Sequence, residues 1–195
     1  MSVEGLSYPL LEGRDSGIDM KNQNAFQELM LKITALGNLE GKVGWFEKYK
    51  YPVTGIPVAQ VAAMQEFGTS TIPARPFMRP AAIKNQQKWQ ETIAKVSKKV
   101  TIGAISPENA MQLITSQAEG DVLQSIKDVD SPPLSKITIG IRKYKQMGKA
   151  ITGKTIGEIA SKIKDGTLDL GGVSTKPLND TGYMIATLTT HIDKK

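Results

Sequence analysis

The chain has 195 residues, of which 39% are hydrophobic and only 6% are aromatic, enough apolar mass for one modest core. It contains no cysteine, which excludes disulfides, thiolate metal sites and thiol nucleophiles. The formal net charge of +6 has two interpretations, a solvated basic surface or contact with nucleic acid or an acidic partner. The only dense basic cluster is Arg142, Lys143, Lys145 and Lys149, and its single aromatic residue, Tyr144, is little for base stacking.

Residues 1–20 lack a continuous apolar segment, so we expect no signal peptide. The longest uncharged apolar stretch, residues 56–64, is too short to span a bilayer. We therefore expect a soluble protein made in the cytoplasm, with no membrane partner.

Residues 1–23 show no clean period and contain three Gly residues and one Pro, which predicts an extended N-terminal arm before a single domain at 24–195. The first helix is predicted from apolar residues at helical spacing, with Asn24 as N-cap and Gly37 as its end. These residues are Phe26, Leu29, Met30, Ile33 and Leu36. Residues 42–48 then predict a strand.

Turn residues at 51–57 precede a short helix, which we expect to begin at Pro57 and to end at Gly68. Pro73, Pro76 and Pro80 follow closely, and prolines at this density exclude a regular helix and predict a stiff, extended loop.

A long amphipathic helix is predicted from about Pro80 to Val100. Ser106 is a suitable N-cap for the next helix, which has Pro107 at its first position and extends to about Ile126. Two successive amphipathic helices predict an antiparallel pair packed on a sheet.

The C-terminal third is less regular. Residues 136–142 fit a strand or a helix, and 148–153 fit a loop. We expect a short helix around 156–163, a glycine-rich hairpin at 166–175 and a terminal strand at 183–192. The predicted fold class is α+β, with a small, mostly antiparallel sheet packed against the long helices.

The residues give little support for catalysis, and we expect no enzyme, no cofactor and no metal site. His191 is the one histidine, and a lone histidine in a terminal strand is usually a surface or edge residue. Asp165, Asp169, Asp180 and Asp193 are scattered and lack the spacing of a metal-binding loop.

Residues 148–155 (GKAITGKT) meet the GxxxxGK[ST] spacing of a phosphate-binding loop. Such a loop follows a buried hydrophobic strand, whereas half of residues 142–147 are charged. We therefore expect no nucleotide site here.

Two stretches carry a resemblance. Residues 58–80 read VAQVAAMQEFGTSTIPARPFMRP, and residues 176–188 read KPLNDTGYMIATL. Together and in this order they resemble the tail-completion and neck (head–tail joining) proteins of long-tailed bacteriophages. Pro133-Leu134-Ser135 resembles the start of a short helix in that family, which favours a helix over 136–142. The segment 146–173 is longer than the family's usual loop and suggests an insertion.

The resemblance implies a structural virion protein that forms a ring, of six copies by analogy, in the neck or at the head-proximal end of the tail. Its expected partners are further copies of itself and adjacent neck, connector or tail-tube proteins, with DNA passing through the lumen. The alternative from the residues alone is a basic nucleic-acid-binding protein that acts without such a ring.

The proline-rich loop supplies the candidate interface residues, because a stiff loop loses little conformational entropy on docking. Phe77 would be a buried anchor, Arg75 and Arg79 would pair with carboxylates of a neighbour, and Glu66 would bind Arg or backbone N–H groups of the loop. Phe67 and Met78 complete the set. The alternative is that Phe77 and Met78 fill the subunit's own core.

Asp180-Thr181-Gly182 predicts a structural turn, with the Asp side chain capping backbone N–H groups and Gly at positive φ.

Overall fold

The computed structural model describes residues 16–46, 48–52, 54–178, 180 and 182–195, with side chains from residue 22 onward. Within these ranges the chain is mostly helical, with one two-stranded antiparallel sheet. In chain order the elements are α1 (Ser16–Gly37), β1 (Leu39–Gly44), α2 (Val58–Phe67), α3 (Met78–Thr101), α4 (Pro107–Asp128), α5 (Lys136–Gln146), α6 (Gly153–Lys164), α7 (Tyr183–Ala186) and β2 (Thr189–Lys194).

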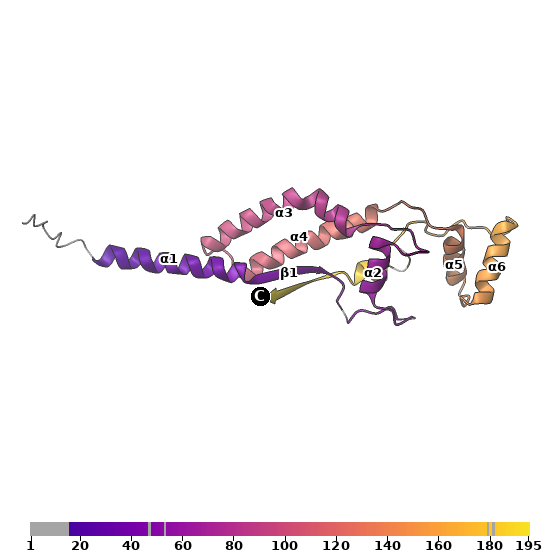
Figure 1. The fold of residues 1–195 in the computed structure, drawn as a ribbon, viewed down its shortest axis with the longest axis horizontal. Helices are drawn as coiled ribbons and strands as arrows, with labels where there is room; N and C mark the ends of the chain where they lie inside the picture. The colour runs from indigo at the N-terminus through magenta and orange to yellow at the C-terminus, as the bar shows by residue number, and fades with distance from the viewer. Residues whose placement is uncertain (1–15, 47, 53, 179, 181) are drawn as a thin grey trace, which may run out of the picture.

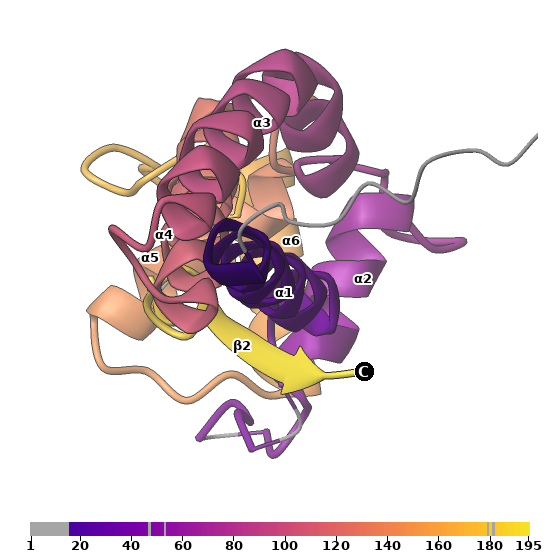
Figure 2. The same ribbon diagram turned by 90° about the vertical axis from the view of Figure 1, so that its left-hand side faces the viewer.

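The molecule is elongated (Figure 1). Helix α1 projects at one end, α3 and α4 pack side by side along the middle, and α5 and α6 stand together at the other end. The strands lie beneath α4, and α2 lies between the long helices and the α5–α6 end. Viewed along the long axis, α1 points out of the body (Figure 2).

Strand β1 pairs with β2 from Leu39 opposite Lys194 to Gly44 opposite Thr189. Helix α4 approaches this ribbon closely at Gly41, where an added Cβ would lie 2.3 Å from a side-chain carbon of Thr115. A glycine at this point is therefore required for helix and sheet to pack.

The N-terminal predictions need two corrections. Helix α1 begins at Ser16 and not after Asn24, so residues 16–23 of the predicted extended arm are helical. The sequence did not predict this start because the residues before Phe26 show no clean apolar period. Residues 1–15 of the predicted arm lie outside the described residues. The predicted strand at 42–48 is displaced, since β1 ends at Gly44 and Trp45 leaves the ribbon to donate its Nε1 hydrogen to the carbonyl of Met184 at 2.7 Å.

The central predictions are confirmed within one or two residues. Helix α2 ends at Phe67, followed by Gly68 at φ 75°, and Pro57 precedes the helix instead of opening it. The loop remains non-helical up to Phe77, and α3 begins at Met78, so that Pro80 lies in its first turn. Ser106 caps α4 by accepting a hydrogen bond from the Asn109 N–H.

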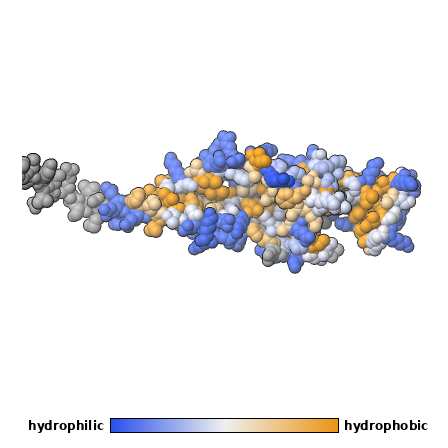
Figure 3. Space-filling model, viewed as in Figure 1, coloured by the Kyte–Doolittle hydropathy of each residue, from blue (hydrophilic) through white to orange (hydrophobic). Residues whose placement is uncertain are grey.

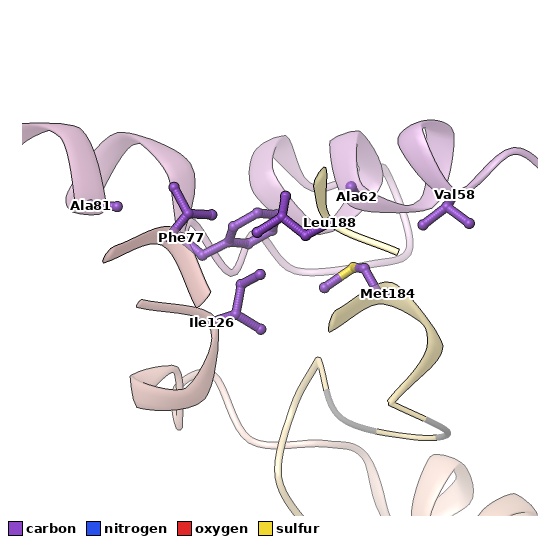
Figure 4. Close-up of a cluster of buried hydrophobic side chains, with 8 residues drawn as sticks. Val58, Ala62, Phe77, Ala81, Ile126, Met184 and Leu188 are labelled. Atoms are coloured by element: carbon purple, nitrogen blue, oxygen red, sulfur yellow. The ribbon is translucent and has the colours of Figure 1, made fainter. Parts of the chain in front are cut away.

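The main core gathers side chains from α2, the loop end, α3, α4 and the C-terminal segment (Figure 4). Its buried members are Val58, Ala62, Phe77, Ala81, Val122, Ile126, Met184 and Leu188. A second, smaller cluster of Val96, Val100 and Ala110 lies further along α3 and α4. The core therefore joins residues more than a hundred positions apart.

The C-terminal third differs more. Residues 136–146 form helix α5, as the resemblance implied, and no strand is found at 166–175 in the described chain. The predicted strand at 183–192 is split, because Gly182 at φ 72° starts the helical turn α7 and the strand begins only at Thr189. Met184 and Leu188 are both buried, and a spacing of four fits a helical turn as well as alternation.

Candidate functional site

Glu66, near the end of α2, holds the start of α3. Its buried carboxylate accepts hydrogen bonds from the backbone N–H groups of Phe77 at 2.7 Å, Met78 at 2.9 Å and Arg79 at 3.2 Å. These are the donors that a helix N-terminus leaves without partners inside the helix. The predicted role of Glu66, binding backbone N–H groups or Arg in this loop, is confirmed, and it is intramolecular.

The side chain of Arg79 adds to this contact, with its Nε 2.9 Å from the Glu66 carboxylate. Burial would raise the pKa of Glu66, but the hydrogen bonds from Phe77, Met78 and Arg79 outweigh it and hold the pKa below its usual value. The carboxylate is thus ionised at neutral pH and stabilises the loop as an anion.

Arg75 binds within its own subunit. It is 5% exposed, its Nε donates to the carbonyl of Pro132 at 2.7 Å, and its Nη2 donates to the carbonyl of Pro133 at 3.1 Å. The predicted pairing with a carboxylate of a neighbour is therefore wrong for Arg75. Its guanidinium instead ties the loop to the α4–α5 connection, because carbonyl oxygens of that connection face it.

Phe77 is fully buried, and its ring meets Trp45 edge to face with 5.8 Å between centroids. Met78 is partly buried against the same core. The alternative interpretation, that these two residues fill the subunit's own core, is correct. Phe77 is not available as an interface anchor, because the loop turns inward where Glu66 fixes its backbone.

Two of the six candidate interface residues, Phe67 and Arg79, are exposed to solvent. Phe67 is 68% exposed, and the Arg79 guanidinium lies over its ring at 5.1 Å from the centroid. Ile83, 78% exposed, follows Arg79 by four residues on α3 and so lies on the same side of the helix. We name Phe67, Arg79 and Ile83 the loop-edge patch.

A second apolar surface lies on α1. On α1, Phe26 is 62% exposed, Leu31 70%, and Met30 and Ile33 46% each, and we name these four residues the α1 patch. Phe26, Met30 and Leu31 line a shallow hollow with Gln27 and Thr34. Apolar residues gather over α1 in the space-filling view (Figure 3). The spacing of Phe26, Met30 and Ile33 correctly predicts a helix, but spacing alone does not show whether other residues cover its apolar face.

The predicted turn at 180–182 is partly confirmed. Gly182 has positive φ, as expected, whereas Thr181 lies outside the described residues. Asp180 makes ion pairs with Arg142 Nε and Lys145 Nζ, both at 3.2 Å. It therefore anchors α5 to this turn.

The residues considered for catalysis and for phosphate binding lie in different parts of the fold. His191 lies in β2, exposed, 2.8 Å from Asp193. The GKAITGKT segment follows helix α5, not a strand, and its Thr152 and Thr155 form a capping box at the start of α6. Among the described residues there is no group of three His, Cys, Asp or Glu side chains placed to hold a metal, and no helix there is long and apolar enough to cross a membrane.

No protein family model matches the chain, and neither a curated protein nor a solved structure matches it.

Proposed function

We propose that the chain is a structural subunit of a tailed-phage particle that assembles with further copies of itself in the neck or at the head-proximal end of the tail. The proposed location in the particle is supported by the resemblance of residues 58–80 and 176–188 to tail-completion and neck proteins. One observation of the structure, the α1 patch, supports the assembly.

Within the part of the chain that the structure describes, helix α1 has too little contact with other elements to account for its apolar side chains. From residue 22 to 37 only Leu29, Lys32 and Leu36 are partly buried, and the other positions are exposed. A helix of this length is marginal in water without tertiary packing. Contiguous exposed apolar residues mark surfaces that another molecule covers.

A second copy of this chain is the occupant that fits. The loop-edge patch, with Phe67 and Ile83 exposed, lies on a different part of the subunit from α1. Two different patches on one subunit make a heterologous contact, which closes into a ring when the rotation between copies allows. Six copies are expected from the resemblance. The ring would then contact adjacent neck, connector or tail-tube proteins.

The test is the mass of the purified protein in solution by light scattering over a range of concentrations. Wild type should form a closed oligomer, and Leu31→Ser should be monomeric. Leu113→Ser is the matched control, because Leu113 is 50% exposed on α4, outside both patches, and this variant should assemble as wild type does. A wild-type protein that stays monomeric at every concentration, alone and with head and tail components, would refute the proposal.

A further inference from the structure

The net positive charge of the chain resides in one segment. Between Lys136 and Lys176 there are nine Lys and Arg residues against three acidic ones, a formal net charge of +6 that equals that of the whole chain. The basic residues are Lys136, Arg142, Lys143, Lys145, Lys149, Lys154, Lys162, Lys164 and Lys176, and the acidic ones are Glu158, Asp165 and Asp169. The remaining residues are balanced, sixteen basic against sixteen acidic.

This segment folds as a helical hairpin of α5 and α6 at one end of the molecule (Figure 1). The two helices pack so closely that a Cβ added at Gly140 would lie 2.6 Å from a side-chain carbon of Ile159. Tyr144 and Ile159 are buried. The two packed helices thus hold the basic residues at the end of the molecule opposite α1.

Some of these cations serve the fold. Arg142 donates to the carbonyls of Ser174 at 2.8 Å and Lys176 at 2.9 Å, and it pairs with Asp180. Lys162 pairs with Glu158 at 2.7 Å. These contacts explain why the hairpin holds together, but they involve only part of its charge.

Three lysines have no such role. Lys136, Lys154 and Lys164 are exposed and make no hydrogen bond or ion pair through their side chains with any residue that the structure describes. Lys136 and Lys154 lie in the first turns of α5 and α6, where no acidic residue is present. A cation there adds to the positive end of the helix dipole and is locally unfavourable. Stability of the subunit does not account for Lys136 and Lys154, whereas Lys164, in the last turn of α6, is placed favourably for the helix dipole.

We propose that the α5–α6 hairpin binds double-stranded nucleic acid through its phosphate backbone. Lysines spread over two helices match a repeating array of phosphates, which supplies affinity without sequence reading. Tyr144 is the one aromatic residue between Lys136 and Lys176, and it is 1% exposed. The hairpin therefore has no exposed aromatic side chain on which the bases of a single strand could stack.

An acidic protein is a poorer fit for this surface, because lysine is depleted in protein–protein interfaces. The inference goes beyond the proposed assembly and does not depend on it, since the lysines lie on α5 and α6 and the assembly contacts on α1, α2 and α3. Either proposal can fail while the other holds.

The experiment measures binding of the full chain to a short labelled DNA duplex by fluorescence anisotropy across a salt series. Wild-type affinity should fall linearly with the logarithm of salt concentration. The variant Lys136→Gln/Lys154→Gln/Lys164→Gln should lose about one unit of that log–log slope for each phosphate contact removed. The matched control, Lys84→Gln/Lys95→Gln/Lys99→Gln on α3, removes the same charge from exposed lysines and should keep the wild-type slope.

Equal losses in both variants would overturn the proposal, because net charge alone would then govern binding. Absence of duplex binding at low salt would also overturn it. So would tighter binding of a single strand of equal length, or of polyglutamate of equal charge. Thermal unfolding of both variants should stay close to wild type. The three hairpin lysines make no described polar contact, and the gain from removing Lys136 and Lys154 at helix N-termini is partly offset by the loss of Lys164 at the end of α6.

Discussion

The contact between Glu66 and the start of α3 permits a quantitative prediction for Glu66→Gln. The amide keeps one acceptor oxygen but directs an NH₂ group at backbone donors, so about half of the contacts to Phe77, Met78 and Arg79 are lost. A buried donor left without a partner costs about 1–3 kcal/mol. We expect a loss of about 3 kcal/mol in the free energy of unfolding, or about 6–12 °C in Tm for a chain of this size.

Arg79→Gln is the control for the ion pair. The Arg79 side chain is 59% exposed, and exposed pairs contribute about 0–1 kcal/mol. It should therefore lower the Tm by less than about 4 °C. Both variants are measured by thermal and denaturant unfolding. Equal effects of Glu66→Gln and Arg79→Gln would refute the reasoning, because the ion pair and not the backbone capping would then be the main contribution.

The same carboxylate predicts a pH dependence. The pKa of Glu66 is lowered in the folded state, so its contribution is complete above the pKa of an unfolded glutamate, about 4.3, and is lost as pH falls through the lower folded value. The stability difference between wild type and Glu66→Gln should therefore be constant near neutral pH and shrink below about pH 4. A difference that grows on acidification would contradict this sign.

Two further pairs of variants separate core from surface. Phe77→Ala should lose about 3–5 kcal/mol in denaturant unfolding, because the ring is fully buried, whereas Phe67→Ala should change stability by less than about 0.5 kcal/mol. A folded, stable Phe77→Ala protein would show that the loop has another packing. Gly140→Ala should lose about 1–3 kcal/mol through its contact with Ile159, while Gly157→Ala on α6, with open space around it, should gain up to about 1 kcal/mol. Thermal unfolding distinguishes the two, and equal shifts would mean that α5 and α6 do not pack as described.

The local features were predictable because they depend on neighbouring residues. Gly68 ends α2 at positive φ and Ser106 caps α4 with its side chain, and both occur where the sequence predicts them. Helix α1 likewise ends at Gly37, as predicted. The predicted α+β class is likewise confirmed, as a mostly helical chain with a two-stranded sheet. Errors arose where one period fits two structures, as at Met184 and Leu188.

By itself the sequence determined the positions of the central helices, the stiff loop between α2 and α3, and the basic character of the chain. Only the tertiary structure decided that Phe77 is buried while Phe67 is exposed, because both are equally apolar and burial depends on what packs across from them. It also brought Arg75 to the carbonyls of Pro132 and Pro133 and left the apolar face of α1 without a cover in the described chain. Contacts between residues so far apart depend on how whole helices pack, and no local period encodes that.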